Sequence, residues 1–310
     1  MTGGILEVHL PTGGVRAEGV GVSARPDQLG VFPPKPSALK EIFGTDRVLI
    51  GVVHSLPLPG SPHYRGQSID EVMTFAVEEA RAYADGGVHG VIVENAWDVP
   101  FARPDDIGPE TPATMGVMAA EVRREVGVPV GVNVLANGSV SSLAAAHAGG
   151  GAFVRVNQWV NGYVANEGFL NGESARATRY RSQLRAEHIR VFADVHVKHG
   201  SHAVIAGRSV PEQAEDNEFF DADVLIATGN RTGDATPLEE IESIQAGSDL
   251  PVIVGSGLTT ENAKETLEVC QGAIVGSALK HNQRWWGRVE VERVRQLAKV
   301  AQEVGYEIGK

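Results

Sequence analysis

The sequence has little cysteine and no long apolar run, and each shortage excludes a class of protein. Cys270 is the only cysteine among 310 residues, which excludes an internal disulfide and a cysteine-rich zinc site. No apolar stretch approaches the roughly 20 residues that span a bilayer. The first residues also lack the basic-then-apolar order of a signal peptide. We therefore expect a cytoplasmic protein with no membrane partner.

Positive charge is also scarce. The chain has 27 Lys and Arg residues against 39 Asp and Glu residues, which gives a net charge of −12, and the basic residues form no cluster. A nucleic-acid backbone binds basic surfaces, so we expect no nucleic-acid partner. A small anion remains compatible with this composition, because backbone dipoles can hold it locally.

The chain divides into an irregular start and a regular remainder. Residues 1–38 are rich in Gly and Pro without a sustained period and predict an N-terminal arm, in which residues 8–10 form a short apolar piece. Over residues 39–310, Val- and Ile-rich runs alternate with segments of helical spacing, which indicates βα units and a parallel sheet. The eight runs are 48–53, 90–93, 130–134, 152–156, 191–195, 224–227, 252–254 and 273–275.

Eight strands close a barrel. The predicted fold is therefore α/β, a single (β/α)8 TIM barrel with an N-terminal extension. An open doubly wound sheet is the alternative. We prefer the barrel because of the strand count, and because the last two strands end alike.

Those last two strands are followed by Gly255-Ser256-Gly257 and by Gly276-Ser277. In barrels, the loops after the seventh and eighth strands often bind phosphate. Small residues are needed there, because backbone N–H groups reach phosphate oxygens only where no side chain blocks them. The sequence therefore predicts a phosphate site at these residues. Lys280 either reinforces it or is a solvated residue at a helix start.

Polar residues at the carboxyl ends of the strands are the other site candidates, because barrel enzymes place their active sites there. The predicted substrate-binding residues are His54, Asn95, Asn133, Asn137, Arg155, Asn157, Thr228 and Asp234. The proline-rich loop 54–62 is a candidate wall of the site or a rigid connector. Trp285 and Trp286 are expected to pack or to contact another subunit, and the Arg residues 176, 179, 181 and 185 to form a solvated helix face.

The fifth run ends in the densest polar group of the chain. If the strand continues, a period of two places Asp194, His196 and Lys198 on one side of it. Together with Glu94, these residues are the predicted catalytic groups, with the two carboxylates as an acid and base pair and Lys198 as a Schiff-base or electrostatic group. The alternatives are a buried ion pair at Asp194, a core histidine at His196 and an anion clamp at Lys198.

A divalent metal held by Glu94, Asp194 and His196 is a further option. The sequence has no spaced metal-ligand motif, so we predict no metal and no cofactor.

Five phrases, in order along the chain, resemble the BtpA family: residues 53–62, 94–101, 131–135, 153–157 and 193–199. The resemblance extends over about residues 41–305. It implies a barrel of the ribulose-phosphate-binding type but no particular reaction. The family takes its name from a role in photosystem I biogenesis, and its members also occur in organisms without photosynthesis. This chain departs from the usual family pattern at residues 136–138 and 165–168.

Two hypotheses follow. The first is an enzyme that acts on a phosphorylated sugar or a nucleoside phosphate, as an isomerase, lyase or glycosidase, by acid and base catalysis. The alternative is a non-catalytic BtpA-like assembly or stability factor that retains a ligand-binding barrel. The expected partner is a phosphorylated small molecule. A homo-oligomer is also expected, because barrels of this type often pair through their outer helices.

Overall fold

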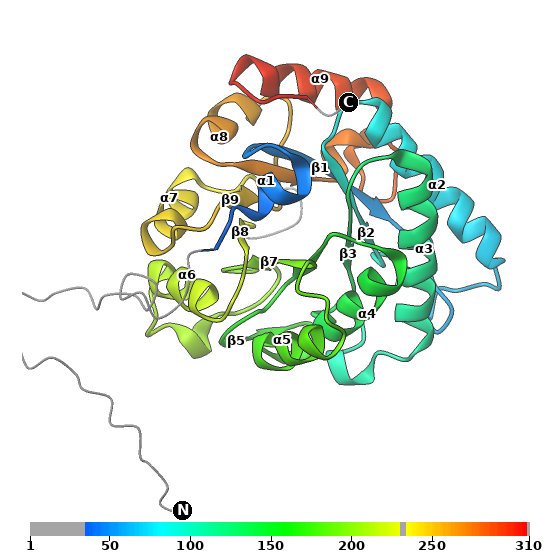
Figure 1. Ribbon diagram of the computed structural model, residues 1–310, viewed down its shortest axis with the longest axis horizontal. Coiled ribbons are helices and arrows are strands. Elements are labelled where there is room, and N and C mark those ends of the chain that lie inside the picture. The colour runs from blue at the N-terminus through cyan, green and yellow to red at the C-terminus, as the bar shows by residue number, and fades with distance from the viewer. Residues whose placement is uncertain (1–34, 230–233, 309–310) are drawn as a thin grey trace, which may run out of the picture. The chain divides into compact units, whose positions relative to one another are not determined.

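The computed structural model describes residues 35–229 and 234–308, in which eight parallel strands close a barrel (Figure 1). The strands, in their order around the barrel, are β1 (Val48–His54), β2 (Gly90–Glu94), β3 (Val130–Asn133), β4 (Phe153–Val156), β7 (Arg190–Asp194), β8 (Val224–Ala227), β9 (Val252–Val254) and β10 (Gly272–Val275). β10 pairs with β1 and closes the ring. The predicted (β/α)8 barrel is confirmed, and each strand coincides with one of the apolar runs.

Helices surround this barrel (Figure 1). They are α2 (Ile69–Asp85), α3 (Glu110–Val126), α4 (Ser139–Gly149), α5 (Ser174–Gln183), α6 (Val210–Phe219), α7 (Leu238–Gly247), α8 (Ala263–Val269) and α9 (Val291–Glu303). The start of α2 shows why the sequence forms a helix there. Ser68 Oγ accepts from the Glu71 backbone N–H at 3.2 Å, and the Glu71 carboxylate accepts from the Ser68 N–H at 2.8 Å, which satisfies two otherwise unpaired donors.

A short helix, α1 (Ala38–Phe43), packs against the apolar interior of the barrel. Leu39 is fully buried in the same cluster as Phe153 and Phe192, whose rings stack with centroids 4.5 Å apart. Phe43 meets Phe153 edge to face. Burial of side chains of this size stabilises a fold by about 1.5–3 kcal/mol each. The interior beside α1 is therefore a packed core.

A hairpin follows β4 that no apolar run in the sequence predicted. Its strands are β5 (Gly162–Ala165) and β6 (Gly168–Asn171). Val164 pairs with Ser201 through two backbone hydrogen bonds of 3.0 and 2.8 Å. Asn137 donates to the Asn171 carbonyl at 3.0 Å. These bonds attach the hairpin to the loops that follow β3 and β7, at the carboxyl ends of the strands.

The predicted solvated arginine face on α5 is wrong at one position. Arg176 and Arg179 are exposed as expected, whereas Arg181 is buried. Its guanidinium donates to Asp221 at 3.0 Å and lies 3.6 Å from Asp223. Helical spacing alone does not show which side of a helix carries partners for its charges.

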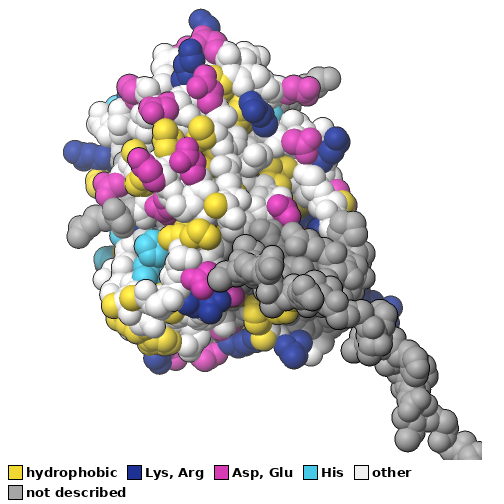
Figure 2. All heavy atoms as spheres, turned by 90° about the vertical axis from the view of Figure 1, so that its left-hand side faces the viewer, with side chains coloured by type: hydrophobic (Ala, Val, Ile, Leu, Met, Phe, Trp, Pro, Cys, Tyr) yellow, Lys and Arg dark blue, Asp and Glu magenta, His cyan; other side chains and the backbone are white. Residues whose placement is uncertain are grey.

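Two further expectations concern the surface and the arm. No helix in the described part of the chain is long and apolar enough to cross a membrane. On the face drawn in Figure 2, side chains of both charges are interspersed. The apolar piece at residues 8–10 and most of the predicted arm lie outside the described residues.

Candidate functional site

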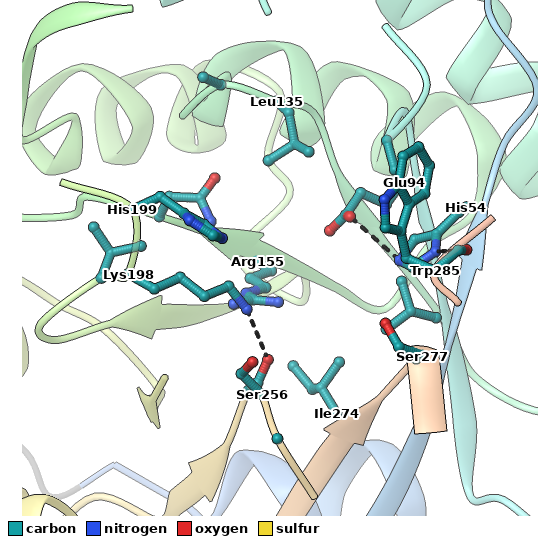
Figure 3. Close-up of a pocket in the computed structure, with 18 of the residues that line it drawn as sticks. His54, Glu94, Leu135, Arg155, Lys198, His199, Ser256, Ile274, Ser277 and Trp285 are labelled. Atoms are coloured by element: carbon teal, nitrogen blue, oxygen red, sulfur yellow. Dashed lines mark hydrogen bonds and ion pairs between the residues drawn. The ribbon is translucent and has the colours of Figure 1, made fainter. Parts of the chain in front are cut away.

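A cavity of about 490 Å³ lies at the carboxyl ends of the barrel strands. The predicted site residues that line it are His54, Glu94, Arg155, Asn157, Lys198, Gly255, Ser256, Gly257, Gly276 and Ser277. Glu94 and His54 lie on one side and Lys198 on the other, with Ser256 and Ser277 along a third side (Figure 3). The structure therefore brings the predicted phosphate loops and several predicted polar groups to one cavity.

Glycine is required in the first of the two loops. Gly257 has a φ of +71°, and a Cβ there would overlap the Asp234 carbonyl. A Cβ at Gly255 would overlap the Ile226 side chain and come within 3.1 Å of the Arg155 guanidinium. At Gly276, in the second loop, a Cβ would have only a 3.3 Å contact with the His54 ring. Close packing therefore fixes glycine in the first loop, and both loops line the cavity with Ser256 and Ser277 among their residues.

Arg155 and Asp194 form a buried bidentate ion pair. Arg155 Nε donates to Asp194 Oδ1 and Nη2 to Oδ2, both at 3.0 Å, and Asn157 donates to Oδ2 at 3.3 Å. Asp194 is 1% exposed and does not line the cavity, whereas Arg155 does. Of the two readings of Asp194, the geometry matches the buried ion pair. The carboxylate positions the arginine beneath the cavity.

Lys198 extends into the cavity from the segment after β7. Its Nζ donates to the Gly255 carbonyl at 3.4 Å, and its backbone N–H donates to Thr228 Oγ1 at 3.0 Å. Burial, aided by the nearby Arg155 charge, lowers the pKa of Lys198 to about 8. At neutral pH about a tenth of such an amine is neutral, far more than for an ordinary lysine with a pKa of about 10.4. A neutral amine can act as a base or a nucleophile.

Glu94 and His54 face each other on the opposite side of the cavity. Asn133 donates to Glu94 Oε2 at 2.7 Å, and His54 Nε2 lies 3.7 Å from Glu94 Oε1. His54 Nδ1 lies 2.7 Å from the Trp285 carbonyl, which only accepts, so Nδ1 carries the proton. Burial and then the Lys280 charge lower the pKa of His54 to about 3, which keeps the ring neutral. Nε2 and the carboxylate are therefore both acceptors, so a bound water can donate to both of them and a bound hydroxyl to either one.

Lys280 lies neither at the phosphate loops nor in solvent, the two places that the sequence suggested for it. It is 1% exposed, does not line the cavity, and lies 3.4 Å from Glu79 Oε2 and 3.3 Å from His54 Nδ1. Burial lowers its pKa, and Glu79 opposes that effect. It is neither a solvated residue nor part of the phosphate loops, but a buried cation behind His54.

His196, unlike Lys198, does not line the cavity. β7 ends at Asp194, so the predicted two-residue alternation stops there. The His196 ring packs on His202 with centroids 3.9 Å apart and does not line the cavity. Burial lowers the pKa of His196 to about 4. Glu94, Asp194 and His196 do not gather, and the described residues contain no group of three metal-ligating side chains.

Four of the predicted substrate-binding residues do not line the cavity; three of them form hydrogen bonds within the fold, and one is exposed. Asn95 accepts from the Leu135 N–H at 2.7 Å, and Asn137 accepts from the Gln158 N–H at 2.8 Å. Thr228 is buried and holds the Lys198 backbone, while Asp234 is exposed. None of the four lines the cavity. Asn133 acts indirectly, through its bond to Glu94.

Sequence reasoning missed several cavity residues. They are Phe101, Tyr163, Asn166, Glu167, Gln283 and Trp285, among others. The Trp285 ring contacts His54 and Trp97 with centroid distances of 5.8 and 4.8 Å, so its expected packing role is only part of its place. Of the proline-rich loop 54–62, only His54 lines the cavity, so of the two readings of this loop the geometry matches the rigid connector.

The fold and site define a (β/α)8 barrel with a charged cavity at the carboxyl ends of its strands. The chain belongs to the BtpA family, which it matches over residues 45–303. It is 40% identical to an uncharacterised protein of Archaeoglobus fulgidus over 256 residues, 83% of this chain and 99% of that one. It is 35% identical to the photosystem I biogenesis protein BtpA of Synechocystis over 246 residues, 79% of this chain and 84% of that one.

Solved structures with the same fold are more distant in sequence. Thiamine phosphate pyrophosphorylase of Pyrococcus furiosus superposes with a TM-score of 0.51 at 17% identity, covering 84% of this chain and 98% of that one. Tryptophan synthase of Mycobacterium tuberculosis superposes with a TM-score of 0.54 at 18% identity, covering 87% and 97%. These likenesses support the barrel assignment.

Proposed function

We propose that the protein is an enzyme that binds a phosphorylated sugar or nucleoside phosphate and acts on it by acid and base chemistry. One observation carries the proposal: Lys198 and Glu94 face one cavity from opposite sides, and its third side is formed by two glycine-serine loops (Figure 3). Loops at this position in barrels often hold phosphate. The name of the thiamine phosphate pyrophosphorylase that shares the fold also refers to a phosphorylated compound.

The phosphate would lie against Gly255, Ser256, Gly257, Gly276 and Ser277. The Gly255 N–H already donates to the Ala227 carbonyl at 2.7 Å, so the uncharged donors would be the other loop N–H groups and the two serine hydroxyls. Lys198 and Arg155, which is paired with Asp194, would supply positive charge from the barrel side. The net charge of −12 belongs to the whole chain, whereas Arg155 and Lys198 line the cavity itself, together with Glu94 and Glu167. The phosphate would then fix the substrate across the barrel.

Glu94 is the proposed acid and base group. Asn133 holds one carboxylate oxygen, and the other faces His54 Nε2 across 3.7 Å. A substrate hydroxyl between them would have these two acceptors within reach, and transfer of its proton to the Glu94 carboxylate is the proposed step. Lys198 is the proposed second group, either as a neutral base or as an amine that condenses with a substrate carbonyl. Asp194 holds Arg155 in place rather than transferring a proton.

A thermal-shift series tests the phosphate part of this proposal. Ribose 5-phosphate and four nucleoside 5′-monophosphates are each compared with the unphosphorylated parent, because a ligand of the native state raises its melting temperature. Stabilisation that depends on the phosphate is the expected result. No response to any phosphorylated compound would contradict the phosphate site and would favour the non-catalytic assembly factor, the role in the name of the Synechocystis relative.

The catalytic part is tested with Glu94→Gln. The amide keeps the size of the side chain and one acceptor but cannot take up a proton. For a substrate found in the series, we expect turnover to fall by about 10²–10⁴-fold while its phosphate-dependent stabilisation is retained. The control is Glu187→Gln, because Glu187 is exposed. Glu79 would not serve as the control, because it pairs with buried Lys280. Full turnover in Glu94→Gln would contradict the assignment.

A further inference from the structure

The wall of the cavity that faces the glycine-serine loops is apolar. Figure 3 places Leu135 on this wall, across the cavity from Ser256 and Ser277, with Arg155 and Lys198 between. Phe101, Ala136 and Tyr163 line the same cavity, and Val99, Ala165 and Val197 add to its apolar lining. The cavity therefore has the two loops at one end, with Ile274 beside them, charged groups in the middle and a mainly apolar wall at the other end (Figure 3).

This wall is packed in place. Ala136, Tyr163, Leu170 and Val197 form a hydrophobic cluster of their own, separate from the core of the barrel, and Phe101 packs against it. The Tyr163 ring stacks on His202 at 5.3 Å with an interplanar angle of 9°. A Cβ at Gly200 would overlap the Tyr163 ring, so glycine there permits the ring to lie close. A side chain held in this way presents a fixed apolar surface.

A sugar phosphate alone has no apolar group that could pack against this wall. Its hydroxyls would need hydrogen bonds that Leu135, Phe101 and Ala136 do not offer, and burying a polar group without a hydrogen bond costs free energy. A planar heterocycle fits better, because its faces pack on aromatic and aliphatic carbon while its edge forms hydrogen bonds. Asn166 and Glu167, at the turn of the β5–β6 hairpin, line the cavity beside the wall and offer both donors and acceptors for that edge.

We infer that the ligand is a nucleoside 5′-monophosphate or a closely similar phosphorylated N-glycoside, with its base on the apolar wall and its phosphate on the glycine-serine loops. The ribose would then lie over Arg155, between Glu94 and Lys198. This inference rests on the proposed function for the phosphate end and adds the class of group at the opposite end. It narrows the two proposed substrate classes to one.

Titration calorimetry of the full chain with ribose 5-phosphate and with AMP, GMP, CMP and UMP tests it. At least one nucleotide should bind about tenfold more tightly than ribose 5-phosphate, since stacking of one base is worth that much or more. Phe101→Ala should remove most of this advantage and leave the affinity for ribose 5-phosphate within about twofold of its original value. Phe169→Ala is the control, because Phe169 is also a phenylalanine but lies on the β5–β6 hairpin, is 49% exposed and is outside the cavity lining.

The possible outcomes distinguish the base site on the apolar wall from the phosphate site on the glycine-serine loops. If ribose 5-phosphate binds as tightly as all four nucleotides, or if Phe101→Ala weakens both kinds of ligand equally, the base site is overturned and the phosphate site stands. If no phosphorylated compound binds, both are overturned. Should Phe101→Ala lower the melting temperature strongly, Phe101→Leu keeps apolar bulk but removes the ring, and it should show the same selective loss for the nucleotide.

Discussion

The two ends of the barrel interior differ in their side chains: one end is apolar and close-packed, and the other end carries charged groups around a cavity. Beside α1, the interior is filled by Leu39, Phe153, Phe192 and apolar side chains from the other strands, all fully buried. At the carboxyl ends of the same strands, Arg155 and Lys198 meet Glu94 around a cavity. β4 contributes to both, with Phe153 at one end and Arg155 only two residues later.

This difference shows that one strand can contribute a core residue at one level of the barrel and a site residue at the next. Alternate residues of a strand point to the same side, so Phe153 and Arg155 both point into the barrel at successive levels. The lower level can be dry and close-packed, because α1 covers it. The upper level contains charges that need partners, and the bidentate pair between Arg155 and Asp194 is one solution. We expect substitutions at the lower level to change folding and those at the upper level to change binding.

Phe153→Ala is expected to have the largest effect. It removes a fully buried ring that stacks on Phe192 and contacts Phe43. The free energy of unfolding should fall by about 3–5 kcal/mol, measured by urea denaturation. Phe169→Ala, at an exposed site, should cost less than about 1 kcal/mol. Equal losses in the two variants would show that the α1 end is not the stabilising core.

Asp194→Asn tests whether the ion pair at the upper level is structural. It leaves the buried Arg155 guanidinium without its carboxylate, and we expect a loss of about 3 kcal/mol in the free energy of unfolding. The exposed pair of Asp105 with Arg176 is the control, and Asp105→Asn should cost less than about 1 kcal/mol. A stable Asp194→Asn protein with lost turnover would instead return Asp194 to the role of a proton-transferring group.

Lys198 should be the most reactive lysine in the described chain. Pyridoxal 5′-phosphate combines a phosphate with an aldehyde, which condenses with a neutral amine and releases water; borohydride then reduces the imine. Because the pKa of Lys198 is about 8, its labelling rate should rise about tenfold per pH unit up to about pH 8 and then level off. Peptide mapping should locate the label at Lys198, with the exposed Lys264 and Lys299 as internal references. Even labelling of all three would contradict a perturbed lysine at the cavity.

Gly276→Ala is expected to have the smallest effect on stability. Its φ is −120°, which any residue adopts, and the added Cβ would have only a 3.3 Å contact with His54. We expect a change below about 1 kcal/mol in the free energy of unfolding. The methyl group would still stand in front of the backbone, so the affinity for ribose 5-phosphate should fall about tenfold. Unchanged affinity would place the phosphate away from the second loop.

The sequence was most informative where burial is continuous. Strands buried on both faces appear as apolar runs, which is why all eight could be counted before the structure was known. The glycine-serine loops could also be predicted, because a φ of +71°, as at Gly257, favours glycine, which can be read from the sequence. The β5–β6 hairpin forms no apolar run in the sequence, since only three of its eight strand residues are buried.

Partners between distant segments were not visible. Lys280 was expected either at the phosphate site or in solvent, because no residue near it in the sequence indicates its partner Glu79, about two hundred residues earlier. The alternation assumed for residues 194–198 failed because β7 ends at Asp194, and the chain bends away and carries His196 to His202. Trp285 was expected to pack or to contact another subunit, and its contact with His54 depends on the closure of β10 onto β1.

The most direct test of a phosphate site at the end of β9 and β10 is a crystal structure of the protein grown with ribose 5-phosphate. The account predicts phosphorus between residues 255–257 and residues 276–277, with backbone N–H groups about 3 Å from its oxygens. Phosphorus bound elsewhere in the cavity or on the surface, with these loops free of it, would contradict the central claim.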